Sequence, residues 1–589
     1  MKHQSKRMNS HGSFSRSLYI LLIITLAVSL VSCQDSGQGV SETSGNAVVE
    51  PDITEPNSAS QQLDLLIERF AESTKPEGGG NTLSDVSAEF YLAEIEANRQ
   101  LLKEINLIDA SQLNLEESID QRMLKGLLES DIYTAEQRRV WENDASLYVP
   151  ASQIGRLLEP LAAEPVEERA STLRSMFDAL PQRFATARAN LKNPPKRFTD
   201  SAIFKTRGTT ESLKNDTAAL AEQLSTSKEA FVQSVDIAIA ALEEYESFLQ
   251  EDLLPRSTGS WAIGKEQYAY ILKHRWHMDD DADSILARGL EAFETTEALA
   301  QEVSERIEPG LHWSEVYEKL KDEHPPADGI KAAYQKSIDE AQAFVLENQI
   351  ITLPAGERVI TVDTPPAMRR SSPFGTFQGV DRFGTDLEGR LVLTPIEDWM
   401  SPEQQAQRLR SHHDAWVPII AVHEAYPGHH ADALITRENP RLLRKVIQEP
   451  IFSEGWGLFT EELMYEKGFL KGDDVRLTQL RNRLWRAARV ILDSSLHTGQ
   501  MTFDEAVEFL AERVRFEPYA AELEVGMYIT YPTYVLGYLI GMQELMAIRE
   551  EWVAKYGEPS PPSEFYNRLL GIGSLPPVLV RESLFGEDQ

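Results

Sequence analysis

Apolar residues recur every three or four positions along most of the chain. In the stretch that begins at residue 61, Leu63, Leu66 and Phe70 have the spacing of one helix face. The pattern continues to residue 585, broken in its last third by short segments that contain proline and glycine. Long amphipathic helices are predicted over 115–144, 166–192, 210–251 and 281–306.

Strand patterns are few. Short runs rich in valine, isoleucine and threonine predict strands over 349–354, 358–366 and 389–395. With 42% hydrophobic and 26% charged residues, the composition is globular. We therefore expect residues 61–585 to form one mainly α unit, with a cleft and a small β element close to a His-Glu motif.

The N-terminus has the pattern of an export signal. Residues 1–17 are basic, residues 18–32 are almost wholly apolar, and the run ends in Leu-Val-Ser before Cys33. This resembles the bacterial lipobox, which implies a signal peptide over 1–32 and lipid attached to Cys33. The alternative is an uncleaved N-terminal anchor, and either would place the body outside the cytoplasm. Residues 33–60 have the polar composition of a disordered tether.

The charge balance excludes some partners. The net charge is −35, and removing residues 1–32 would bring it to −39 because that segment carries four positive charges and no acid. Such a surface repels nucleic acid phosphates and does not dock electrostatically on anionic lipid. We therefore expect no nucleic acid partner, and contact with a membrane only through the lipid. Because Cys33 is the single cysteine, an intrachain disulfide is also excluded.

The segment Ala-Val-His-Glu-Ala-Tyr-Pro-Gly-His-His resembles a zinc hydrolase motif with an insertion. In H-E-x-x-H motifs, two histidines four positions apart share a helix face and bind zinc, and the glutamate takes a proton from water. Here His423 and Glu424 fit the start, but Pro427 stands where the second histidine belongs. His429 follows His423 by six positions, which on a regular helix would turn its ring away.

Proline and glycine between the two histidines change this expectation. Pro427 and Gly428 predict a bulge or break that could return His429 to the face needed for metal binding. His430, seven positions after His423, is the alternative ligand, and otherwise we expect it to contact substrate. A surface turn without any metal is the competing interpretation of the segment.

A third ligand is available downstream. Glu454 stands in Ser-Glu-Gly-Trp-Gly, 25 residues after His429, in a context that resembles the third-ligand segment of zinc aminopeptidases. Glu461 lies seven positions later on the same helix face, where it could accept a hydrogen bond from a ligating histidine. His423, His429 and Glu454 are therefore the predicted zinc ligands, and Glu424 the predicted general base.

Four segments together resemble a known family. VHEAYPGHH, SEGWGLFTEEL, LWRAARVILDSSLH and YPTYVLGYLIG follow one another as in the bacterial family called domain of unknown function 885. That resemblance covers roughly 61–585. It implies a helical cleft like that of gluzincin metallopeptidases of the neurolysin and carboxypeptidase type, with zinc as cofactor.

The third segment offers groups for substrate binding. Arg486, Arg489, Asp493 and His497 are spaced so that one helix face can present them all. An arginine could bind a substrate carboxylate, and we assign this role to Arg489. The alternative is an internal Arg-Asp pair that ties two helices.

The fourth segment is rich in tyrosine. A tyrosine hydroxyl near the metal could stabilise an oxyanion, and the prediction is Tyr538, assisted by His497. Core packing is the alternative role, and it is the one expected for most of Tyr528, Tyr531, Tyr534 and Tyr538. Met527 and Thr533 depart from the family pattern, which leaves the preferred substrate open.

The sequence thus predicts an exported, lipid-anchored zinc hydrolase that cleaves peptide bonds, in short peptides above all, at the cell envelope. Two alternatives remain at this point. One is hydrolysis of other amides or esters, and the other is a surface lipoprotein that binds peptides without cleaving them.

Overall fold

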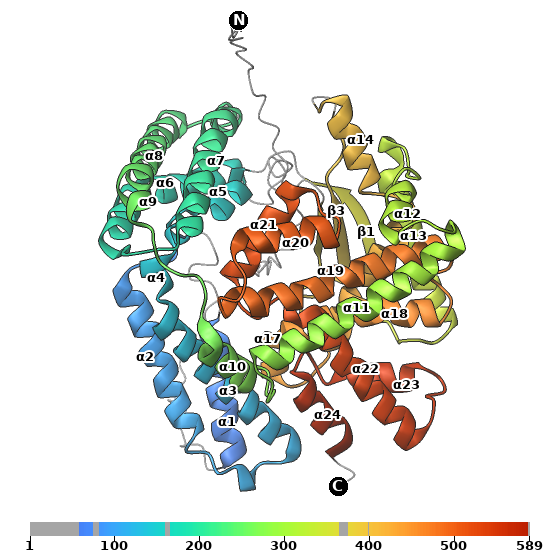
Figure 1. The fold of residues 1–589 in the computed structure, drawn as a ribbon. Helices are drawn as coiled ribbons and strands as arrows, with labels where there is room; N and C mark the ends of the chain where they lie inside the picture. Colours follow the sequence, from blue (N-terminus) through green and yellow to red (C-terminus); the bar gives the residue numbers. More distant parts are fainter. Residues whose placement is uncertain (1–57, 75–81, 159–164, 365–374, 398–399, 587–589) are drawn as a thin grey trace, which may run out of the picture.

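The computed structural model describes residues 58–74, 82–158, 165–364, 375–397 and 400–586. The predicted lipidation site, Cys33, and the predicted signal peptide lie outside these residues. The described chain is mainly α-helical with one three-stranded sheet, which confirms the predicted fold class (Figure 1).

Within the described residues, the regular elements that precede the sheet are all helices. The α-helices among them are α1 (Ala59–Ser73), α2 (Ala88–Ile105), α3 (Leu115–Arg138), α4 (Val140–Asn143), α5 (Ala151–Leu158), α6 (Val166–Asn190), α7 (Lys196–Ala221), α8 (Lys228–Phe248), α9 (Leu254–Arg256), α10 (Gly264–Arg275), α11 (Ala282–Ile307), α12 (Trp313–Leu320) and α13 (Ile330–Glu347).

Helices also follow the sheet. They are α14 (Pro402–Arg410), α15 (Val417–Ile420), α16 (His429–Thr436), α17 (Leu442–Val446), α18 (Pro450–Glu466), α19 (Asp473–His497), α20 (Phe503–Arg513), α21 (Pro518–Thr530), α22 (Leu536–Tyr556), α23 (Ser563–Gly571) and α24 (Pro577–Phe585).

Two of the long predicted helices are each two helices. The range 115–144 is interrupted at Arg139, whose backbone is left-handed (φ 42°), so α3 ends there and α4 begins. The range 210–251 is interrupted between α7 and α8, because the segment Glu-Gln-Leu-Ser-Thr-Ser favours a turn over a helix interior. Periodicity alone missed both breaks, because apolar residues continue on both sides of them.

The sheet has the order β1-β3-β2. Strand β1 (Arg358–Asp363) pairs in parallel with β3 (Glu388–Leu393), and β2 (Gly375–Gln378) pairs with β3 in antiparallel fashion. The predicted strand at 349–354 is wrong: these residues form a turn after α13 in which Gln349 has φ 51°. Strand β2 was not predicted, since four residues give too little alternation to recognise.

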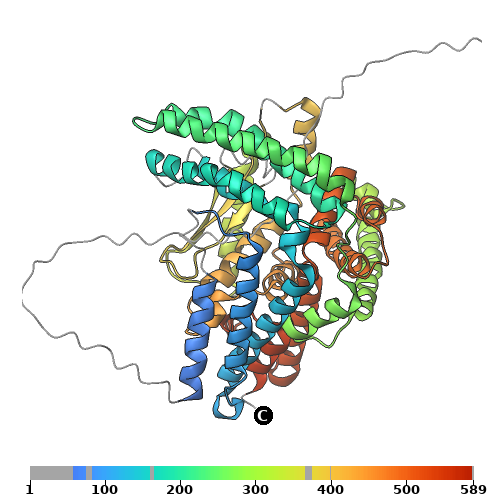
Figure 2. The same ribbon diagram turned by 90° about the vertical axis from the view of Figure 1, so that its left-hand side faces the viewer.

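Helices α18 and α19 contribute to two separate hydrophobic cores. Helix α19 runs beside α11 and α18 beside α22, as Figure 1 shows at the lower right. One core packs α18 and α22 against α1, α3 and α13, and a second packs α19 against α11 and α21. Helices α5 to α8 have a third core of their own and form the projecting upper layer of Figure 2.

Helix α18 approaches α22 closely because both carry glycine at the contact. A Cβ atom on Gly455 would stand 2.7 Å from the Cα of Gly541. No larger residue fits there, so the backbone next to Glu454 rests directly on α22. Within the described residues, none of the helices combines the length and the apolar character that crossing a membrane would require.

Candidate metal centre

The helix that carries the His-Glu pair breaks as the Pro-Gly pair predicts. Helix α15 runs into one π-helical turn, η7 (Ala421–Ala425), which ends at Tyr426 in an extended conformation. The Tyr426–Pro427 peptide bond is cis, and α16 begins at His429. A side chain at Gly428 would collide with the backbone oxygen of His423, so this tight path requires glycine.

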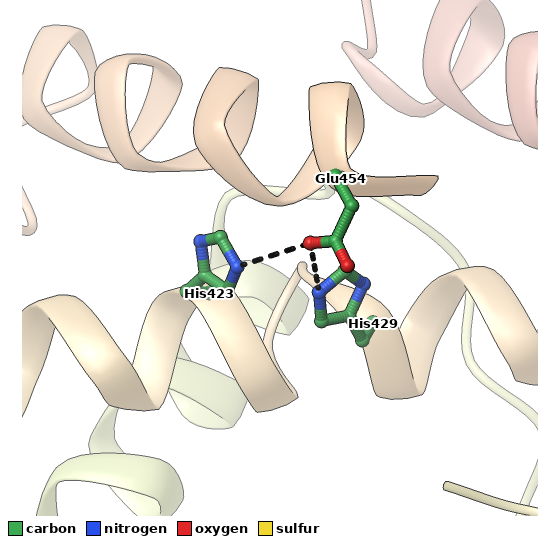
Figure 3. Close-up of side chains that lie close together, drawn as sticks. All are labelled: His423, His429 and Glu454. Carbon is green, nitrogen blue, oxygen red and sulfur yellow. Dashed lines mark ion pairs between the residues drawn. The ribbon is translucent and has the colours of Figure 1, made fainter. Parts of the chain in front are cut away.

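This path brings His423 and His429 to the same side of α18, where Glu454 faces them (Figure 3). Nε2 of His423 lies 4.0 Å from Oε2 of Glu454, and Nε2 of His429 lies 3.5 Å from the same oxygen. One donor atom from each residue lies within 4.8 Å of the other two. Ligands bound tetrahedrally to zinc stand about 3.3 Å apart, so a small contraction would suffice to hold the ion.

The donor atoms also have the hydrogen bonding expected of metal ligands. Nδ1 of His423 contacts Oε1 of Glu461 at 2.9 Å, which turns Nε2 toward Glu454. Within the described part of the chain, Nε2 of His423 and Oε2 of Glu454 are buried and make no hydrogen bond of normal geometry. Polar atoms buried in this way are costly unless something binds them, and a cation that accepts nitrogen and oxygen donors fits.

A glycine makes room for the first histidine. A Cβ atom on Gly457 would stand 2.7 Å from Cε1 and 2.8 Å from Nε2 of His423. The second glycine of the Ser-Glu-Gly-Trp-Gly segment therefore accommodates the imidazole ring, one turn of α18 from Glu454.

The charges within the cluster favour a bound cation. Burial alone would raise the pKa of Glu454, but the His429 ring beside it lowers that pKa to about 2. Burial alone would lower the pKa of His429, but the Glu454 carboxylate and the nearby Glu424 raise it to about 9. Without a metal, a proton on His429 thus neutralises Glu454, and a divalent ion could take its place.

A cavity of about 480 Å³ opens next to this cluster. His423 and Glu424 form part of its wall, and Oε2 of Glu424 is buried with no hydrogen-bond partner in the described part of the chain. Other parts of the wall come from α12, α13, β2, β3, α14, α15, α19 and the α21–α22 region. The predicted β element therefore does lie at the site, and Glu424 is available to a molecule in the cavity.

The sequence matches a known family over most of its length. Residues 74–584 correspond to the family described as bacterial protein of unknown function (DUF885). The chain belongs to this family. No curated protein matches it.

Two solved structures resemble this DUF885 protein in fold. One is a protein from Shewanella oneidensis named as a lipoprotein of unknown function, with 20% sequence identity and a TM-score of 0.75. The other, from Colwellia psychrerythraea and also named as a lipoprotein, has 19% identity and a TM-score of 0.74. Each match covers 90% of this chain and 100% of the other. At these identities the likeness establishes the shared fold alone.

His430 lies apart from the cluster. Its ring is fully buried, and Nε2 contacts Oε2 of Glu357 at 2.9 Å. Tyr426 donates a hydrogen bond to the same oxygen at 2.6 Å, and these contacts lower the pKa of Glu357 even though burial opposes the change. Of the two adjacent histidines, the structure thus brings His429 to Glu454 and ties His430 to the residue before β1. The predicted contact of His430 with substrate is not favoured by this burial.

The tyrosine nearest the cluster is not the predicted one. The hydroxyl of Tyr534 donates to Oε1 of Glu454 at 3.2 Å. Tyr538 also lines the cavity, but the guanidinium of Arg489 covers its ring at 4.5 Å from the centroid. Tyr534 lies in the turn before α22 and Tyr538 in the first turn of that helix, so helical spacing could not decide which hydroxyl reaches Glu454.

His497 belongs to a buried network away from the cavity wall. Its Nε2 contacts the backbone oxygen of Tyr528 at 3.0 Å, and burial lowers its pKa to about 4. Beside it, Asp493 accepts hydrogen bonds from the Thr533 backbone at 3.0 Å and the Tyr268 hydroxyl at 2.9 Å. The structure therefore does not bring His497 to the cluster, and the predicted oxyanion role has no geometric support. His497 and Asp493 instead stabilise the segment before Tyr534, through their contacts with the backbone of Tyr528 and Thr533.

The two arginines of α19 differ in their partners. Arg489 lines the cavity but makes an ion pair with Glu524 at 3.1 Å. Arg486 lines it too, and the internal Arg-Asp pair that the sequence left open as an alternative is not formed, since Arg486 bonds to Asn482 and Asp493 to Tyr268. Glu461, Glu524 and Tyr534 complete this site. The sequence indicated Glu461 through its spacing from Glu454, and Tyr534 only as one of four tyrosines, whereas Glu524, like the Glu357 that contacts His430, had no sequence signal.

Proposed function

We propose that this protein is a lipid-anchored, zinc-dependent hydrolase of peptide bonds that acts on short peptides at the cell envelope. The observation that carries the proposal is the cluster of His423, His429 and Glu454 beside a cavity that Glu424 also lines. This His2Glu set with an adjacent glutamate is the donor set of gluzincin peptidases. The lipoprotein names of the two structural relatives support the lipid anchor.

In the proposed reaction, side chains of this protein act as metal ligands, as general base and as oxyanion donor. His423, His429 and Glu454 would hold zinc, which when bound polarises the scissile carbonyl and makes water a better nucleophile. Glu424, with a free carboxylate oxygen, takes the proton from the attacking water and then gives it to the leaving nitrogen. The Tyr534 hydroxyl, already directed at Glu454, donates to the oxygen that becomes negative.

The decisive experiment compares Glu424→Gln with Glu454→Gln, with zinc content and hydrolysis of a mixed short-peptide pool measured on the same preparations. Glu424→Gln should keep full zinc and lose about 10²–10⁴-fold in turnover, the usual contribution of a general base. Glu454→Gln removes a charged ligand, so zinc and turnover should fall together.

Two results would reject the proposal. Peptide hydrolysis by Glu424→Gln at the parental rate would rule out this mechanism. A parent that holds zinc but cleaves nothing among peptides, other amides and esters would favour a peptide-binding lipoprotein, while cleavage of esters or non-peptide amides alone would change the substrate class.

A further inference from the structure

Three arginines of α19 gather around one tryptophan in the cavity wall. The guanidinium carbons of Arg481, Arg486 and Arg489 lie 5.9, 4.5 and 4.0 Å from the centroid of the Trp485 ring. All four side chains line the cavity, and the arginines are at most 8% exposed. Three like charges are thus crowded where water screens them poorly.

Only one of the three is neutralised. Arg489 has its ion pair with Glu524, whereas no carboxylate in the described ranges lies within 4.0 Å of Arg481 or Arg486. Their hydrogen bonds go to Asn482, at 3.4 Å each, which is longer than the usual donor–acceptor distance of about 2.7–3.2 Å. The Nε atoms of both are buried and, among the described residues, have no partner.

Burying these two unpaired guanidiniums lowers the stability of the folded protein. A buried charge without a counter-ion loses its hydration, and contacts with aromatic rings replace only part of it. Burial lowers the pKa of Arg486 even though Glu461 acts in the opposite direction, so the charge is undercompensated. In a chain of net charge −35, carboxylates for pairing are abundant, yet these two guanidiniums face a cavity.

We propose that Arg481 and Arg486 form a receptor for a ligand carboxylate, and that the ligand is a peptide with a free C-terminus and an apolar last residue. The apolar preference follows from the rings around Arg481, since Tyr317, Trp485 and Phe516 pack on its guanidinium and line the same cavity. A guanidinium binds a carboxylate through two parallel hydrogen bonds, which a C-terminal amide cannot accept.

This receptor rests on the proposed function and refines it. Arg481 and Arg486 line the same cavity as His423 and Glu424. A peptide whose C-terminal carboxylate is held by the two arginines would therefore have a bond close to that carboxylate at the metal cluster. The enzyme would release one or a few residues from the C-terminal end.

The test is equilibrium binding of N-acetyl-Ala-Phe and of its C-terminal amide. Binding is measured by titration calorimetry with the mature Glu424→Gln protein, in which the bound peptide should persist, and with Arg481→Met and Arg486→Met in that background. The control is Arg513→Met, because Arg513 also packs on two rings, those of Phe293 and Phe509, but lies outside the cavity and pairs with Glu297. The stoichiometry of each titration reports the folded fraction.

We expect the free acid to bind about 10- to 100-fold more tightly than the amide, as charge-assisted hydrogen bonds allow. Either cavity substitution should remove that difference while the affinity for the amide stays within about twofold, and Arg513→Met should change neither. Equal binding of acid and amide to the parent, or equal loss of both in the variants, would overturn the receptor.

Hydrolysis by the wild-type protein separates this inference from the proposed function. Tighter binding of the acid without any hydrolysis would support the carboxylate receptor and reject the proposed peptidase activity. Hydrolysis of acid and amide at equal rates would support the peptidase activity and reject the receptor.

Discussion

Nδ1 of His423 lies 2.9 Å from Oε1 of Glu461, while Nε2 of the same ring faces Glu454 at 4.0 Å. The carboxylate on one side of the imidazole thus fixes which nitrogen is free on the other. Glu454 and Glu461 are two turns apart on α18, so one helix supplies both a candidate ligand and the group that orients another.

Glu461→Gln should therefore weaken zinc binding without removing a ligand. We expect a loss of about 10–100-fold in zinc affinity, the usual effect of losing a carboxylate that supports a ligating histidine. Competition against a chelator measures it. The matched control is Glu462→Gln, the next residue on α18, which pairs with Arg476 and Arg483. Equal affinities in both variants would show that Glu461 does not orient the ring.

Gly457→Ala should disturb the same ring from its other side. The added methyl would press on His423 at 2.7 Å, which we expect to lower zinc affinity about tenfold or more and to cost about 1–3 kcal/mol of stability through overpacking. Zinc content and thermal unfolding report the two effects. Gly208→Ala on α7, where a Cβ atom meets nothing within 4 Å, should instead gain up to about 1 kcal/mol. A stable, fully zinc-loaded Gly457→Ala protein would refute this explanation of the glycine.

Zinc binding should release a proton. The pKa of His429 is raised from 6.5 to about 9 in the metal-free protein, so at pH 7 the ring is protonated and must lose that proton to bind zinc. We expect release of about one proton and an apparent affinity that rises about tenfold per pH unit from pH 7 to 9. Calorimetry in buffers of different ionisation enthalpy measures the release, and heats that do not depend on the buffer would contradict it.

Whereas zinc affinity should rise with pH, the folding stability of the metal-free protein should fall as the pH rises. A raised histidine pKa stabilises the fold fully below pH 6.5, and this contribution is lost as the pH rises through 9.

Asp493 should make the fold less stable as the pH rises. Burial raises its pKa from 3.8 to about 7, so between these values the folded chain holds a proton that the unfolded chain releases. Stability should fall by up to about 1.4 kcal/mol per pH unit in that interval. Asp493→Asn keeps an acceptor for the Thr533 amide and should remove this slope in thermal unfolding from pH 4 to 8. Asp473→Asn, which changes a half-buried carboxylate on the same helix α19 that pairs with Arg306, should retain the slope. An identical slope in Asp493→Asn would exclude the Asp493 carboxyl as its source.

Tyr534, in the turn before α22, and Tyr538, in its first turn, should differ in their effect on the reaction. Tyr534→Phe removes the hydroxyl that reaches Glu454 and should lower kcat by about 10²–10³-fold, the typical cost of losing an oxyanion donor. Tyr538→Phe should act mainly through packing with Arg489 and leave kcat within about tenfold. Rates on one peptide decide between them, and the reverse order would restore Tyr538 to the role predicted from the sequence.

Local features of the site could be predicted because their causes are local. Proline and glycine at 427 and 428 break a helix wherever they stand, so the return of His429 toward His423 follows from the sequence. Apolar periodicity likewise gave α1, α6 and α11 to within a few residues.

The groups that the sequence did not reveal come from distant segments. Glu357 approaches His430 from 73 positions upstream, and Glu524 reaches Arg489 from another helix. Nothing near Arg481 distinguishes it from any other arginine of an amphipathic helix. Its significance lies in the missing partner, which only the packing of α19 against its neighbours reveals.

The guanidiniums around Trp485 are enclosed by a strongly acidic molecule, and this has a kinetic consequence. An anionic peptide in solution meets the summed charge of −35 long before it meets Arg481 or Arg486. The peptide is therefore repelled at long range and is attracted only when it comes close to the arginines. Added salt shortens the reach of the repulsion to about 10 Å at 0.1 M while the enclosed contact is screened far less. For such a ligand the association rate should thus increase with ionic strength, the reverse of ordinary electrostatic steering.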